Sequence, residues 1–202
     1  MKEHFEILLK KTPLIAILRG ITPSEVAGVC DILFEAGIFL LEIPLNSPNA
    51  FASIKIAAEH SRGRQLVGAG TVLTPEDVRR VQESGGCFII SPNTDIEVIR
   101  ETKKCGMLSM PGFFTASEAF TALKAGADYL KLFPANLGPG YVKDLQAVIK
   151  APIFAVGGVN QENISAFLKL CAGVGIGSAL YKAGKTNSEI AADAQKLVRN
   201  IH

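Results

Sequence analysis

Asp128-Tyr-Leu-Lys-Leu-Phe-Pro134 is an apolar run of strand length, and the way in which such runs recur decides the fold. Eight of them begin near positions 14, 39, 66, 87, 107, 129, 153 and 173. Consecutive starts lie roughly 20 to 27 residues apart, the length of a strand, a helix and two loops. Continuous apolar runs are typical of parallel strands that are buried on both faces. The spacing therefore predicts eight βα units.

The segments between the runs carry helix signals. Thr74-Pro75 and Thr115-Ala-Ser-Glu118 have the composition of helix N-termini, and Gly37 and Gly126 stand where helices are expected to end. Eight units in 202 residues predict one domain over 1–202, a (β/α)8 TIM barrel of the α/β class with a short N-terminal helix. The alternative is an open flavodoxin-like sheet with extra units.

Composition excludes several classes of function. The formal charge is +2, without a basic run that would attract nucleic acid or anionic lipid, and the apolar runs are too short to cross a membrane. The four cysteines form no CxxC pair, and no secretory signal is recognisable. We therefore expect a cytoplasmic protein with reduced thiols, and neither nucleic acid nor membrane as a partner.

Lys131 is unusual among the 14 lysines because it lies inside a predicted strand. A buried amine usually has a depressed pKa or a charged partner. A neutral amine at pH 7 is what Schiff-base chemistry requires. The alternatives are a lysine paired with a carboxylate or one that extends out of the barrel end.

Glu42 occupies the matching place in the second strand, Leu40-Leu-Glu-Ile-Pro-Leu45. The second and sixth strands face each other across a ring of eight, so Glu42 and Lys131 are expected over one pocket. An amine and a carboxylate so placed can act as a nucleophile and a general acid/base. The alternative for this pair is a structural salt bridge.

Three further polar residues follow predicted strands at the same rim. The guanidinium of Arg19 suits a substrate carboxylate, and Thr71 and Asn46 offer a hydroxyl and an amide for the carboxylate, a water or sugar hydroxyls. Ser91 also ends a strand there. A loop cap is an equally good reading of Thr71 and Ser91.

The last two strands end in glycine turns, Gly157-Gly158 and Gly177-Ser178, the latter before an expected helical stretch at 179–182. In barrels these two loops often bind phosphate through backbone N–H groups and a helix N-terminus. The sequence predicts a phosphate site here, with ordinary tight turns as the alternative.

From about Leu14 to Gly184 the chain resembles the class I aldolases that split 2-keto-3-deoxy-6-phospho sugar acids. The specific motifs are Gly68-Ala-Gly-Thr-Val-Leu73, Leu130-Lys-Leu-Phe-Pro-Ala135, Pro111-Gly112 and Val156-Gly-Gly-Val159. The resemblance implies that Lys131 forms the Schiff base, that Glu42 is the acid/base, and that the glycine turns and Ser178 bind phosphate. It also implies a homotrimer, with Pro92 and Phe133 packed against the Schiff base.

Two positions bear on the substrate epimer. The branch of this family that acts on the gluconate epimer tends to have arginine and threonine where this chain has Asn46 and Val156, so the chain is more similar to the galactonate branch. Phe113-Phe114 replace residues that are commonly small, which puts the shape of the pocket in question.

The function implied is cleavage of a phosphorylated keto-deoxy sugar acid, 2-dehydro-3-deoxy-6-phosphogalactonate, to pyruvate and glyceraldehyde 3-phosphate. No cofactor and no metal are expected, since none of the three histidines (His4, His60, His202) ends a strand. The alternatives are the gluconate or 4-hydroxy-2-oxoglutarate substrates of the same family, a phosphate-binding isomerase or epimerase, and a non-catalytic phosphosugar sensor.

Overall fold

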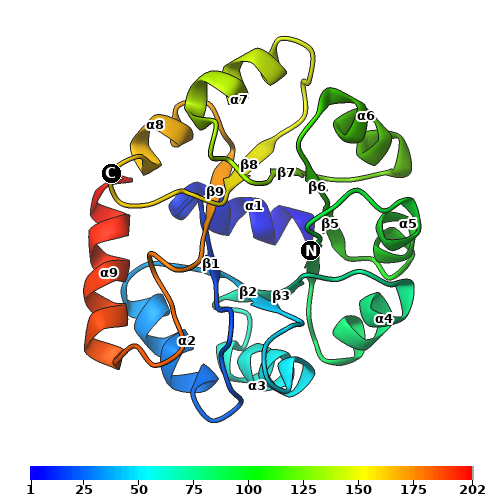
Figure 1. The fold of residues 1–202 in the computed structure, drawn as a ribbon. Coiled ribbons are helices and arrows are strands. Elements are labelled where there is room, and N and C mark those ends of the chain that lie inside the picture. Colours follow the sequence, from blue (N-terminus) through cyan, green and yellow to red (C-terminus); the bar gives the residue numbers. More distant parts are fainter. Residues whose placement is uncertain (202) are drawn as a thin grey trace.

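The computed structural model describes residues 1–201 as a parallel barrel surrounded by helices (Figure 1); His202 lies outside the described residues. Its strands pair in the order β5-β4-β3-β2-β1-β9-β8-β7-β6. Their bounds are β1 (Leu14–Ile17), β2 (Leu40–Pro44), β3 (Leu66–Gly70), β4 (Phe88–Ile90), β5 (Leu108–Met110), β6 (Gly112–Phe113), β7 (Leu130–Leu132), β8 (Ile153–Val156) and β9 (Gly173–Ile176).

β5 and β6 are two halves of one extended segment, interrupted at Pro111, which has no N–H for the ladder. Backbone bonds cross the interruption: the N–H of Tyr129 donates to the carbonyl of Ser109 at 3.2 Å, and that of Lys131 to Pro111 at 2.9 Å. The ring therefore closes with eight units, and the predicted barrel is confirmed. Apart from β6, which continues the segment of β5, each strand begins within one residue of a predicted position.

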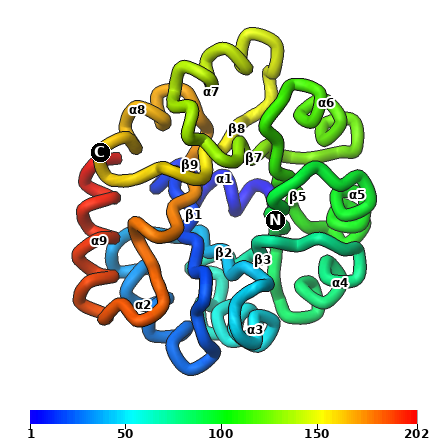
Figure 2. Tube along the Cα trace, viewed as in Figure 1, coloured from blue at the N-terminus to red at the C-terminus, as the bar shows by residue number. Residues whose placement is uncertain are grey.

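An outer ring of helices covers the strands, and α1 (Lys2–Lys11) lies across one end of the barrel (Figure 1). The outer helices are α2 (Val26–Glu35), α3 (Ala50–Ser61), α4 (Pro75–Glu83), α5 (Ile96–Lys104), α6 (Ala116–Ala125), α7 (Gly138–Gln146), α8 (Ile164–Leu168) and α9 (Asn187–Arg199). Figure 2 shows the chain following the ring in sequence order, so that α9 returns to lie beside α2. No helix within residues 1–201 has the length and apolarity to cross a membrane.

Thr74 and Thr115 cap α4 and α6 as predicted, and one expected helix is absent. Thr115 and Glu118 form a capping box at the start of α6. The stretch 179–182 was expected to be helical, and that prediction is wrong: the N–H groups of Leu180 and Tyr181 both donate to the carbonyl of Gly177, which makes a single turn. The chain leaves this turn by residue 181, and a second turn at 183–184, in which Gly184 has a φ of +88°, precedes α9.

The interior of the barrel is closed at its N-terminal end by an aromatic cluster. Phe5 of α1 is fully buried, and its ring centroid lies 5.5 Å from that of Phe88 and 5.2 Å from that of Tyr129. The ring of Phe154 lies 5.6 Å from Tyr129 and completes the cluster. These rings block the end of the barrel opposite to the carboxyl ends of the strands, so a cavity can open at that carboxyl end alone.

Replacement of Phe5 by alanine tests this role of α1. We expect Phe5→Ala to lower the free energy of unfolding by about 3 to 5 kcal/mol, because it leaves a cavity inside the barrel. The control is Ile7→Ala on the same helix, where the side chain is 48% exposed, with an expected change within about 0.5 kcal/mol. Urea denaturation measures both. Equal losses for the two variants would contradict the closing role of Phe5.

Candidate active site

A cavity of about 350 Å³ opens at the carboxyl ends of the strands. This is the end of a (β/α)8 barrel at which active sites form, because side chains from several strand ends converge there. Eight of the twelve predicted site residues line it: Arg19, Lys131, Phe133, Val156, Gly157, Gly158, Gly177 and Ser178. The structure thus brings most of the predicted site together in one place.

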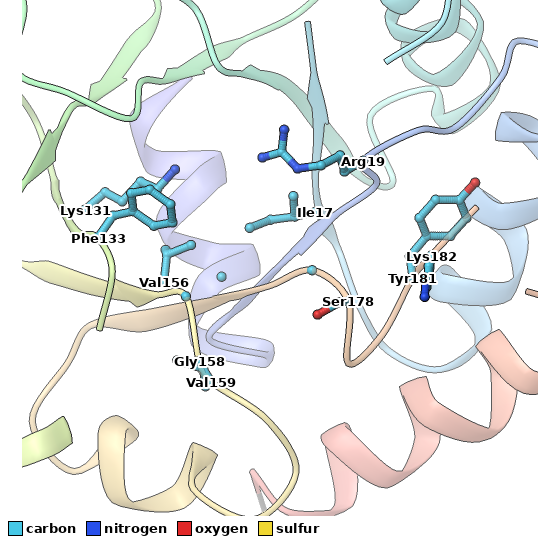
Figure 3. Close-up of a pocket in the computed structure, with 13 residues that line it drawn as sticks. Ile17, Arg19, Lys131, Phe133, Val156, Gly158, Val159, Ser178, Tyr181 and Lys182 are labelled. Atoms are coloured by element: carbon cyan, nitrogen blue, oxygen red, sulfur yellow. The ribbon is translucent and has the colours of Figure 1, made fainter. Parts of the chain in front are cut away.

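Lys131 lies in the middle of β7 and is 5% exposed. Its Nζ lies 4.8 Å from the centroid of the Phe133 ring, and it reaches into the cavity beside that ring (Figure 3). Burial lowers the pKa of Lys131, the charge of Glu42 partly offsets this, and the charge of Arg19 adds to the lowering. The surroundings therefore shift the amine in the direction of its neutral form, which is the nucleophilic one.

Glu42 lies in β2 and is 1% exposed. Burial raises the pKa of its carboxyl group, against the opposing effects of Lys131 and Arg19. Within residues 1–201 the carboxylate and the Lys131 ammonium form no ion pair, although each affects the pKa of the other. A direct structural salt bridge, the alternative reading of the pair, is therefore not formed.

Arg19 follows β1 and approaches the same space from the side opposite to Lys131 (Figure 3). Its Nη1 donates to Oδ1 of Asn46 at 2.5 Å, which holds the guanidinium beside the loop after β2. Arg19 adds a fixed positive charge to this end of the cavity, and its remaining N–H groups can bind an anion.

The opposite end of the cavity is built from backbone. Gly157 and Gly158 have φ values of +88° and +82°, in the left-handed region that favours glycine. The N–H groups of Gly158 and Ser178 donate to no protein acceptor within residues 1–201. Lys182 also lines this cavity. Free N–H donors with a nearby cation make a site for an anion.

Four predicted site residues do not line the cavity: Glu42, Asn46, Thr71 and Pro92. Thr71 adopts a φ of +56°, a strained conformation for a β-branched residue. Ser91 acts as a loop cap, because its hydroxyl donates to the carbonyl of Val72 at 2.8 Å.

Phe113 and Phe114, which were expected to alter the shape of the pocket, do not line it. Phe113 is 2% exposed and packs in the core between strands and helices. The ring of Phe114 lies 5.3 Å from that of Tyr141, whose hydroxyl donates to the carbonyl of Phe114. Phe114 thus packs against α7, and neither phenylalanine lines the cavity.

Five residues that line the cavity were not predicted: Ile17, Val159, Gly175, Tyr181 and Lys182. Ile17 and Gly175 lie two residues before Arg19 and Gly177, so strand alternation contained a signal for them. Tyr181 and Lys182 lie in the turn that was expected to be helical, and no signal in the sequence placed them.

The match to known families covers almost the whole chain. Residues 5–197 match the family model of the KDPG and KHG aldolases. The chain belongs to this aldolase family. It is 47% identical over 193 residues to the 2-dehydro-3-deoxy-6-phosphogalactonate aldolase of Escherichia coli K12, with 94% of each chain covered.

Two solved structures extend the comparison with the family. A structure described as native KDPGal superposes with a TM-score of 0.91 at 46% identity and 94% coverage of each chain. The KDPG aldolase of Legionella pneumophila, with pyruvate captured as a covalent carbinolamine, superposes with a TM-score of 0.82 at 25% identity, over 97% of this chain and 95% of the other.

The pKa of Lys131 can be measured by trace labelling with acetic anhydride and peptide mass spectrometry over a range of pH. We expect a labelling midpoint below 10.5, the ordinary lysine value, because burial disfavours the ammonium. Glu42→Gln should lower the midpoint further, since it removes the charge that favours the ammonium. The exposed Glu59→Gln serves as the control without effect. A midpoint at or above 10.5, or one insensitive to Glu42→Gln, would contradict this description of the site.

Proposed function

We propose that the chain is a Schiff-base aldolase that cleaves 2-dehydro-3-deoxy-6-phosphogalactonate to pyruvate and glyceraldehyde 3-phosphate. The observation that carries the proposal is the buried Lys131, lining a cavity and electrostatically coupled to Glu42 without an ion pair. The family and the name of the 47% identical relative support the same reaction.

The first half of the proposed reaction builds the iminium. Nζ of Lys131 attacks the C2 ketone and forms a carbinolamine, and Glu42 donates the proton with which the C2 oxygen leaves as water. The raised pKa of Glu42 suits this step, because it shifts the carboxyl group in the direction of its protonated, proton-donating form.

The second half breaks the carbon–carbon bond. The C4 hydroxyl loses its proton to the Glu42 carboxylate through a water, and the electrons of the C3–C4 bond move into the iminium. Glyceraldehyde 3-phosphate leaves, and the enamine that remains on Lys131 takes up a proton at C3. Hydrolysis of the resulting iminium releases pyruvate and restores the amine.

The two ends of the cavity fit the two charged ends of this substrate. Arg19, held by Asn46, would bind the carboxylate together with the Thr71 hydroxyl. At the other end the N–H groups of Gly157, Gly158, Gly177 and Ser178, with the cation of Lys182, would bind the phosphate. Phe133 and Pro92 would shield the Schiff base from water.

Subunit assembly and location are proposed on more general grounds. Phe120 and Leu137 are 43% and 57% exposed, apolar surface available to subunit contacts in the expected homotrimer. All four cysteines are free thiols, which fits a cytoplasmic protein. One barrel domain over 1–202 remains part of this proposal.

Trapping with pyruvate and borohydride tests the nucleophile. We expect the wild type to gain one reduced pyruvate adduct, mapped to Lys131, and Lys131→Ala to fold without gaining it or releasing pyruvate in a lactate-dehydrogenase-coupled assay. The control is Lys169→Ala, which removes an exposed lysine and should keep full activity. Pyruvate release without any adduct would mean that the bond is broken without a Schiff base on Lys131. Conversion of the substrate without pyruvate release would indicate an isomerase, and binding without any conversion a sensor.

Val156→Thr tests the choice of epimer. The added hydroxyl offers a hydrogen bond to a sugar hydroxyl, worth about 1 kcal/mol, so the ratio of kcat/KM for gluconate over galactonate substrate should rise by about fivefold. Val156→Ala removes methyl groups without adding a donor and should leave the ratio near that of the wild type. An equal change in both variants would mean that the size of the side chain, and not its hydroxyl, governs the choice.

A further inference from the structure

β3 carries two buried glycines, Gly68 and Gly70, that lie on one side of the strand. A Cβ added to Gly68 would lie 2.2 Å from Cδ2 of the Phe88 ring. A Cβ added to Gly70 would lie 1.6 Å from Oε1 of Glu42. Both positions therefore make room for a neighbouring side chain, a core ring in one case and the Glu42 carboxylate in the other.

The backbone itself does not require glycine at position 70. Gly70 is absent from the glycines with positive φ, so an L residue can adopt its conformation. Glycine in a strand interior is normally disfavoured, because it costs conformational entropy and packs no side chain. The three nearest heavy atoms to an added Cβ all belong to Glu42, at 1.6, 2.5 and 2.9 Å. The requirement for glycine is therefore steric, and the nearest obstacle is the Glu42 side chain.

Within the described part of the chain, the Glu42 side chain makes no hydrogen bond that would set its position. Among residues 1–201 no hydrogen bond to its side chain is formed, although the residue is 1% exposed. The carboxylate lies in the space left by Gly70, which pairs with Pro44 in the β2–β3 ladder. Its oxygen lone pairs consequently stay free to accept and return protons.

From this geometry we infer that Gly70 is a positioning residue of the aldolase reaction: the missing side chain at 70 seats the Glu42 carboxylate opposite Lys131. The inference rests on the proposed function of Glu42 as acid/base. The colliding atom is the far end of a flexible side chain, so alanine at 70 displaces the carboxylate and leaves β3 in place.

Gly70→Ala gives the primary test. We expect kcat to fall by about 100-fold or more, the size of a lost general acid/base, while KM changes by less than about threefold and the thermal midpoint stays near that of the wild type. Gly68→Ala is the matched control on the same strand; it collides with a core ring and should lower the thermal midpoint. Gly28→Ala in α2, where an added Cβ meets nothing within 4 Å, should leave kcat unchanged.

A shorter carboxylate separates positioning from general damage. Glu42→Asp removes the methylene that carries the carboxylate against position 70. The double variant Gly70→Ala/Glu42→Asp should therefore recover kcat by at least about tenfold over Gly70→Ala, a non-additive coupling. A kcat of Gly70→Ala within about threefold of the wild type, or losses that are additive in the double variant, would overturn the inference.

A readout that needs no turnover distinguishes failure of this inference from failure of the proposed function. If the wild type forms no pyruvate adduct on Lys131, the aldolase proposal fails. The positioning of the Glu42 carboxylate by Gly70 can still be tested by the labelling midpoint of Lys131, which depends on the Glu42 charge. A labelling midpoint that shifts in Gly70→Ala and not in Gly28→Ala supports the positioning role of Gly70. An unchanged midpoint in Gly70→Ala overturns it.

Discussion

Lys131 and Glu42 are buried in the same barrel, close enough for each to alter the pKa of the other, and they do not close into an ion pair. Removing an amine and a carboxylate from water costs several kcal/mol, which a direct pair would partly recover. Without a direct pair this cost is only partly offset, so the pKa of Lys131 is lowered and that of Glu42 is raised. The Lys131 amine and the Glu42 carboxyl group are therefore not bound to each other and can react with a ketone and protonate its leaving oxygen. The other features of the site surround these two groups.

The surrounding packing explains how the two groups are kept apart. The rings of Phe5, Phe88 and Phe154 fill the N-terminal end of the barrel interior and leave the carboxyl end open. The Phe133 ring lies against the Lys131 amine, and the glycine at position 70 leaves a space for the Glu42 carboxylate. Arg19 adds a positive charge that further disfavours the ammonium. Aromatic side chains and a glycine thus surround the Lys131 amine and the Glu42 carboxylate.

The sequence predicted the parts of the site that follow from strand periodicity. Lys131 and Glu42 were found because polar residues inside apolar strands stand out, and because strands four apart in a ring of eight face each other. The strand starts were correct for the same reason, since buried parallel strands are continuously apolar.

Other parts depend on neighbours from distant segments and were not predictable in this way. The stretch 179–182 forms one turn that is bonded to the carbonyl of Gly177 and does not continue as a helix, which its residue types do not reveal. The role inferred for Gly70 depends on the register between β2 and β3, because Glu42, the side chain nearest to it, belongs to β2. Tyr181 and Lys182 reach the cavity through an irregular loop, which carries no periodic signal.

The most direct measurement of the central claim is the carbon-13 NMR spectrum of pyruvate, labelled at C2, in the presence of excess protein at neutral pH. If the Lys131 amine is held neutral and reactive, the C2 signal moves from the ketone to the position of a carbinolamine or iminium carbon, and this change is lost in Lys131→Met. A C2 signal that stays at the ketone position when the protein is saturating would contradict the account.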